Sequence, residues 1–130
     1  MNSKPANALE ANLRLVIYQI EKITLEIEQR KALSERILAK LKEQLETYCS
    51  VRNNPIALLD HSAGQGYLKD REHINQLIRE TKHQICMEER SCFNDLQKLQ
   101  WEKRNLEREK AELEFNLSLI KKNSTQSDAS

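Results

Sequence analysis

The side chains with the most reactive chemistry in this chain are its three cysteines and three histidines. His83 and Cys86 lie three residues apart, so a helix would place them on one face, and Cys92 follows further along the chain. A structural zinc site normally needs four such ligands in convergent positions. The remaining candidates, Cys49, His61 and His73, do not converge with these three. We therefore expect no metal site.

The chain also lacks the sequence signatures of enzymes. It contains no glycine-rich phosphate loop, no HExxH helix and no Ser/His/Asp arrangement. Its carboxylates are spread among lysines and arginines rather than gathered in a pocket that could shift a pKa. We expect no catalytic residue, no cofactor and no small-molecule ligand.

The composition is typical of a helical interaction protein rather than of a globular domain with a thick core. Of the 130 residues, 38% are hydrophobic, 5% aromatic and 32% charged. The 21 basic and 20 acidic residues nearly cancel, which argues against nucleic acid or an anionic membrane as a partner. Strictly apolar runs reach only four residues, far below the roughly 18 of a membrane span.

Cysteine usage and the N-terminal residues give an expectation for the compartment. Residues 1–5 lack the basic-then-apolar pattern of a secretory signal, and an odd number of cysteines does not suit a disulfide framework. We expect an intracellular protein with reduced thiols, in the cytoplasm or on the cytoskeleton, with the nucleus not excluded.

Hydrophobic periodicity is the strongest structural signal. Apolar residues alternate in steps of four and three, which predicts a helix over residues 6–50 after a disordered lead-in at 1–5. The stripe is formed by Leu9, Leu13, Val16, Ile20, Ile23, Ile27, Arg30, Ser34, Ile37, Leu41 and Tyr48.

A break follows at residues 51–67, which hold Pro55, Gly64 and Gly66, with a possible short helix at 55–61. A second helix is predicted over residues 68–122, and a Ser-rich disordered tail over 123–130. The stripe of this second helix is formed by Ile74, Ile78, Thr81, Ile85, Glu88 or Glu89, Cys92, Leu96, Leu99, Lys103, Leu106, Lys110, Leu113, Leu117 and Ile120.

The two stripes match when the chain folds back on itself. If residue i faces residue 119 minus i, Leu13 meets Leu106 and Leu41 meets Ile78. Because a heptad repeat matches itself after a shift of seven, sums of 112 and 126 also fit in part. The loop length favours 119, since 126 would leave residues 67–72 looped out.

In this alignment a polar position in the first stripe also faces a polar position in the second stripe. Arg30 would face Glu89, with Glu88 beside it. Because removing one partner of a half-buried ion pair costs more than the pair contributes, such a pair serves alignment better than stability. We predict that Arg30, Glu88 and Glu89 set the register of the hairpin.

In the same alignment the end of helix two has nothing opposite it. Leu113, Leu117 and Ile120 would be left uncovered, together with the nearby Phe115. This stretch either frays or binds a partner, and the apolar content favours a partner site. Trp101 lies off the stripe on a charged face, where it either contacts another helix or lies flat across its own.

These patterns predict an all-α fold, a long antiparallel two-helix coiled-coil hairpin that could assemble into a multi-helix bundle. The expected function is a non-enzymatic structural or adaptor subunit of a larger assembly of cytoskeletal, ciliary, centrosomal or chromosome-associated type. Its expected partners are other coiled-coil or helical proteins, in homo- or hetero-oligomers. Two alternatives are a parallel dimeric rod and a regulatory module that presents its C-terminal amphipathic helix to a groove.

Overall fold

The computed structural model describes residues 3–54 and 65–129, and every element in these two ranges is an α-helix. Helix α1 spans Ser3–Asn53 and helix α3 spans Gln65–Ala129. Both run without a break because no glycine or proline occurs in residues 6–54 or 67–129. The predicted short helix at 55–61 lies outside the described residues.

Both helices are longer than the periodicity predicts. At the end of α1 the backbone N–H of Asn54 donates a 3.2 Å hydrogen bond to the carbonyl of Val51. Pro55 follows Asn54 in the sequence and disfavours a helical conformation for it, which gives a physical reason for the end of α1.

Helix α3 includes residues 123–129, for which the sequence predicts a disordered tail. Polar residues there lower helix propensity by less than about 1 kcal/mol each, and no proline stops the helix.

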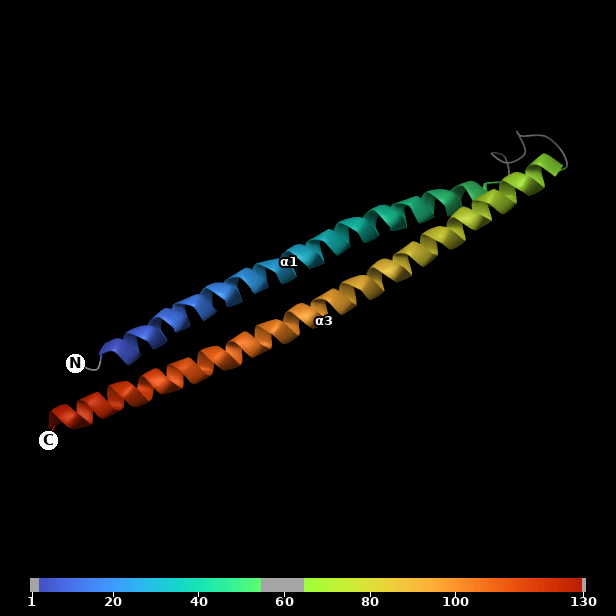
Figure 1. The fold of residues 1–130 in the computed structure, drawn as a ribbon. Coiled ribbons are helices and arrows are strands. Elements are labelled where there is room, and N and C mark those ends of the chain that lie inside the picture. Colours follow the sequence, from blue (N-terminus) through green and yellow to red (C-terminus); the bar gives the residue numbers. More distant parts are fainter. Residues whose placement is uncertain (1–2, 55–64, 130) are drawn as a thin grey trace. The chain divides into compact units, whose positions relative to one another are not determined.

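The chain divides into two compact units. Unit 1 consists of Met1–Gln29 and Leu96–Ser130, and unit 2 consists of Arg30–Asp95. Each unit contains one segment of α1 and one segment of α3, which run in opposite directions (Figure 1). The predicted all-α helical hairpin is therefore confirmed. A parallel rod, in which the two helices of one chain would not meet, is not the arrangement found.

The core of each unit is thin and comes from the predicted stripes. In unit 1 the buried side chains are Val16, Ile23, Ile27 and Leu117, and in unit 2 they are Ser34, Ile78, Thr81 and Cys92. The buried hydroxyl of Thr81 donates a 2.7 Å hydrogen bond to the carbonyl of Leu77, one turn back, so its burial leaves no unpaired donor. Within the described residues neither helix has a stretch of the length and hydrophobicity needed to cross a membrane.

The register of the helices differs from the sequence prediction by one heptad. In unit 1, residues from Gln19 to Glu26 line one groove together with residues from Glu102 to Glu109. In unit 2, Ile37 and Leu41 line another with residues from His83 to Ser91. In both grooves, the numbers of the α1 and α3 residues that face each other add up to about 126, and neither groove agrees with a sum of 119.

The heptad repeat accounts for this error. A shift of seven preserves every stripe position, so the stripes alone cannot choose between 119 and 126. Loop length favours 119 only if residues 67–72 are counted as excess loop, whereas these residues form part of α3. With the sum at 126, Leu117 faces Leu9 in unit 1, and Cys92 faces Ser34 in unit 2.

The corrected register also explains how two lysines occupy stripe positions. Lys110 now faces Val16 and Lys103 faces Ile23, instead of Leu9 and Val16. Both lysines are half-buried, whereas Val16 and Ile23 are buried. The aliphatic part of a lysine can cover an apolar neighbour while its ammonium group reaches water. The Lys110 Nζ lies 3.7 Å from a Glu114 carboxylate oxygen on the same helix.

Candidate functional site

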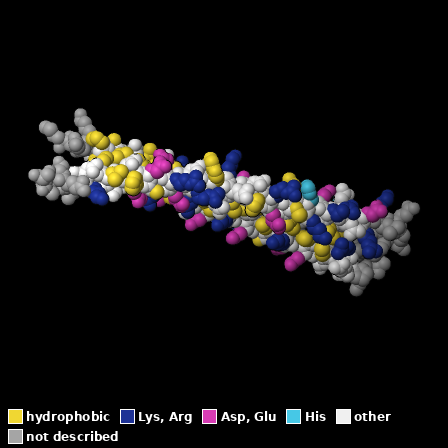
Figure 2. Space-filling view, turned by 90° about the horizontal axis from the view of Figure 1, so that it is seen from below, with side chains coloured by type: hydrophobic (Ala, Val, Ile, Leu, Met, Phe, Trp, Pro, Cys, Tyr) yellow, Lys and Arg dark blue, Asp and Glu magenta, His cyan; other side chains and the backbone are white. Residues whose placement is uncertain are grey.

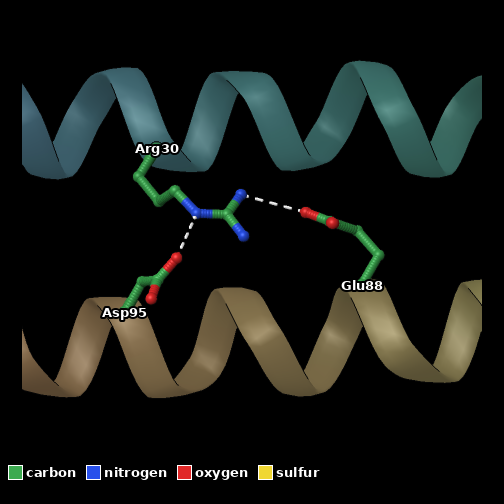
Figure 3. Close-up of polar contacts among 3 residues, drawn as sticks. All are labelled: Arg30, Glu88 and Asp95. Carbon is green, nitrogen blue, oxygen red and sulfur yellow. Dashed lines mark hydrogen bonds and ion pairs between the residues drawn. The ribbon is translucent and has the colours of Figure 1, made fainter.

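Arg30 forms a two-carboxylate ion-pair site in unit 2. Its Nη1 donates a 2.9 Å hydrogen bond to Oε1 of Glu88, and its Nε donates a 2.9 Å hydrogen bond to Oδ2 of Asp95 (Figure 3). The two acids lie seven residues apart, so α3 presents them on the same face two turns from each other. The guanidinium group reaches from α1 between them.

Burial distinguishes the two ion pairs. The side chains of Arg30 and Glu88 are only 16% and 17% exposed, whereas that of Asp95 is 53% exposed. The pKa of Arg30 is raised above its ordinary value, mainly by the hydrogen bonds to Asp95 and then Glu88, with burial opposing them. A raised pKa means that the fold favours the charged guanidinium group, and this contribution is lost in strong alkali, as the pH rises through the pKa of Arg30.

The site agrees with the sequence prediction in two of its three residues. Arg30 and Glu88 meet as predicted, but Glu89 is exposed and the second carboxylate belongs to Asp95. The reason is helical geometry: Glu89 lies about 100° further around α3 than Glu88, whereas Asp95 returns almost to the same side. A search for acids seven residues apart would have found Asp95. The register-setting role of this site remains a prediction.

The C-terminal stripe is not exposed as the sequence predicts. Leu117 is only 7% exposed, and Leu113 and Ile120 are half-buried. The shift of register by seven brings the first turns of α1 opposite this part of α3, and α1 begins at Ser3 rather than at residue 6. These three residues therefore help to form the packed side of unit 1 and do not form an uncovered surface.

Two of the predicted contact residues lie on the opposite side of α3. Trp101 and Phe115 are 60% and 63% exposed, and Leu119 near them is also exposed. Trp101 and Phe115 are fourteen residues apart, which is nearly four full turns, so they share one face of α3. We call Trp101, Phe115 and Leu119 the α3 outer face.

Helix α1 carries a second apolar face that the sequence prediction missed. Leu15, Tyr18 and Leu25 are all more than half exposed, and they lie on the side of α1 away from Val16 and Ile23. Their spacing of three and seven residues was the available signal. We call these three residues the α1 outer face. In the view of Figure 2, hydrophobic side chains are interspersed with basic and acidic ones.

The candidate metal ligands are dispersed. The described residues contain no group of three or more His, Cys, Asp or Glu side chains arranged to hold a metal ion. Cys49, Cys86 and Cys92 are free thiols, and Cys92 is buried as part of the unit 2 core. His83 is exposed and borders the apolar groove of unit 2, while His61 lies outside the described residues.

Comparison with known proteins gives a family but no activity. Residues 7–120, which include most of α1 and α3, match the model of a family of unknown function, DUF8104. The chain belongs to this family. Its matched region ends at Ile120, the last residue of the predicted stripe, so both outer faces lie inside the family region. No curated protein and no solved structure matches the chain.

Proposed function

We propose that this DUF8104 member is a non-enzymatic structural or adaptor subunit that holds helical partners in a larger intracellular assembly. The observation that carries the proposal is the pair of outer faces in unit 1. Exposed apolar side chains gathered on one face of a structure commonly mark an interaction site. A helix that is apolar on two opposite sides is suited to be covered on both of them.

The position of the two faces favours a bridging role. In unit 1 each helix uses one side to pack against the other helix and carries its outer face on the opposite side. A two-helix unit of this kind can therefore contact one helix through α1 and another through α3. Such contacts build multi-helix bundles from separate chains.

The chemistry of the chain supports a binding role. The 21 basic and 20 acidic residues nearly cancel, which argues against nucleic acid as a partner. The three free thiols suit a reducing compartment. The alternative regulatory module, which would insert the C-terminal stripe into a partner groove, would have to pull Leu117 away from α1. That step would forfeit apolar burial that the hairpin already has.

Capture of partners from cell extracts by the intact chain tests the proposal. The α1 outer face is changed by Leu15→Glu with Leu25→Glu, and the α3 outer face by Trp101→Glu with Phe115→Glu. A matched control, Gln100→Glu with Ser118→Glu, adds the same charge at exposed positions about a quarter turn from the α3 outer face. Far-UV circular dichroism establishes that each variant retains its helices.

The expected result is that the intact chain and the control capture the same coiled-coil or helical proteins. Each outer-face variant should lose a different subset of them, because the two faces hold different neighbours. Cross-linking followed by mass spectrometry would assign each captured protein to a face. Capture that persists unchanged in both outer-face variants would contradict the proposal.

A further inference from the structure

We infer that the α3 outer face binds a second copy of this chain, with the two α3 helices antiparallel about a two-fold axis near residue 110. This inference deepens the proposed function, because it names the occupant of one of the two outer faces. It leaves the α1 outer face free for a different partner.

The first argument is the spacing of residues on the α3 outer face. Trp101, Arg108 and Phe115 follow one another at intervals of seven, and Glu112 and Leu119 form a second series four residues behind. With Asn105, which precedes Glu112 by seven residues, the six positions alternate in steps of four and three, which is the pattern of a helix seam that packs against another helix. This seam lies opposite the stripe that packs on α1.

The second argument is that the seam is complementary to itself. In an antiparallel pair that places residue i against residue 220 minus i, Trp101 faces Leu119 of the second copy. Arg108 then faces Glu112 of the second copy, and the two-fold axis repeats both contacts. The pairing therefore places an aromatic ring against an aliphatic side chain at each end and two opposite-charge pairs at the centre. Phe115 faces Asn105, which is half-buried at the edge of the groove with α1.

The third argument is that the central charges are available for this pairing. Arg108 and Glu112 are both exposed, and neither forms an ion pair within the described part of the chain. Along a helix, an arginine four residues before a glutamate is the weaker of the two possible orders. Contact across the two-fold axis gives each charge a partner that its own helix does not supply.

The α1 outer face does not have this symmetry. Its seam runs through Leu15, Tyr18, Lys22 and Leu25, and its central charge is a lysine with no acid in the seam to meet it. Pairing α1 with α1 in the same manner would place Lys22 against Tyr18. The charge pattern thus assigns the second copy to α3.

The area of the α3 outer face indicates the strength of the dimer. Large aromatic side chains bury about 150–250 Å² each when fully covered. With the observed exposures, Trp101, Phe115 and Leu119 offer about 300 Å² of apolar surface per copy. Because this is less than the roughly 800 Å² per partner of a standard interface, we expect a dissociation constant in the micromolar range.

Sedimentation analysis of the purified full chain tests the inference by comparing variants in which the charges at Arg108 and Glu112 are reversed, singly and together. Arg108→Glu alone and Glu112→Arg alone each place like charges opposite one another, so each should weaken dimerisation by about tenfold or more. The double variant, Arg108→Glu with Glu112→Arg, restores opposite charges and should restore the dimer. Circular dichroism serves as the folding control, since both positions are exposed.

Trp101 provides an independent readout because it is the sole tryptophan. Its fluorescence should shift to shorter wavelength as the chain concentration rises through the dissociation constant, and in both single charge variants the shift should require a correspondingly higher concentration. A loss in the single variants that the double variant does not reverse would contradict the Arg108–Glu112 contact.

Three other outcomes would also overturn the inference. They are a chain that remains monomeric at about 100 µM, a dimer that is insensitive to the charge changes, and species that keep growing with concentration. The last would indicate a head-to-tail contact rather than a two-fold one. A monomeric chain that still captures helical partners through its outer faces would refute this inference and leave the proposed function standing. A dimer that captures no other protein would support this inference and refute the proposed function.

Discussion

The guanidinium group of Arg30 on α1 lies 2.9 Å from the carboxylate of Glu88 on α3, and both side chains are mostly withdrawn from water. An ion pair in such a position gains little net stability, because desolvation of the two charges offsets their attraction. It does penalise arrangements that separate the charges. If the numbers of facing residues added up to 119, Arg30 would lie near Glu88 and Thr81, and it would lose Asp95. We therefore expect the site to disfavour that neighbouring register.

The unequal burial of the two acids predicts unequal losses on mutation. Glu88→Ala leaves the mostly buried guanidinium with one partner fewer and should lower the free energy of unfolding by about 1–3 kcal/mol. Asp95→Ala removes a largely exposed partner and should cost less than about 1 kcal/mol. Urea unfolding of both variants, followed by circular dichroism, measures the difference. Equal losses would mean that burial does not determine the strength of these pairs.

Unit 1 offers a matched pair of side chains for testing its core. Ile23 is 6% exposed, whereas Leu25, two residues later on the same helix, is 52% exposed. Ile23→Ala should destabilise the chain by about 2–4 kcal/mol, because it removes buried methyl groups and leaves a cavity against α3. Leu25→Ala should change stability by less than about 0.5 kcal/mol. Thermal unfolding of the two variants side by side provides the comparison. A larger loss for Leu25→Ala would show that the α1 outer face is already covered under the conditions used.

The sequence predicts the helices well because their signal is local and repeated. Among the residues whose burial the structure describes, the stripe from Leu9 to Tyr48 and the stripe from Ile74 to Ile120 contain all the buried hydrophobic side chains. Register is a different kind of property, since seven-residue shifts preserve the stripes and the choice between them depends on where α3 begins. The register with the sum at 119 leaves Leu117 without a partner, whereas in the structure Leu117 is buried.

The outer faces were harder to find for another physical reason. Exposed apolar residues scattered on a surface are common, so Leu15, Tyr18 or Leu25 alone carries no signal. They become informative only when the packed side of the same helix is known. The sequence places Trp101 off the stripe, but its relation to Phe115 and Leu119 becomes visible only from the orientation of α3.

The register itself can be measured with a disulfide. Ser34 and Cys92 are both buried in unit 2 and face each other when the sum is 126. Ser34→Cys, in a chain with Cys49→Ser and Cys86→Ser, should therefore form a disulfide with Cys92 under mild oxidation. The control for the sum of 119 combines Ser34→Cys with Ile85→Cys and Cys92→Ser in the same background, and it should remain reduced. Peptide mapping without reductant distinguishes the two variants. A disulfide in the control and none between residue 34 and Cys92 would support the sum of 119.

The same assay tests whether Arg30 sets the register. Arg30→Leu replaces the one cation of the α1 stripe with an aliphatic side chain, so this stripe loses a feature that distinguishes 126 from 119. In this background the Ser34→Cys and Ile85→Cys control should begin to form its disulfide, and the Ser34→Cys link to Cys92 should form less completely. The double variant Arg30→Leu with Glu88→Leu, which leaves no unpaired buried charge, should recover stability without recovering a single register. If Arg30→Leu leaves both the disulfide pattern and the melting temperature unchanged, Arg30 has no part in alignment, and the register must be set by the small Ser34–Cys92 layer instead.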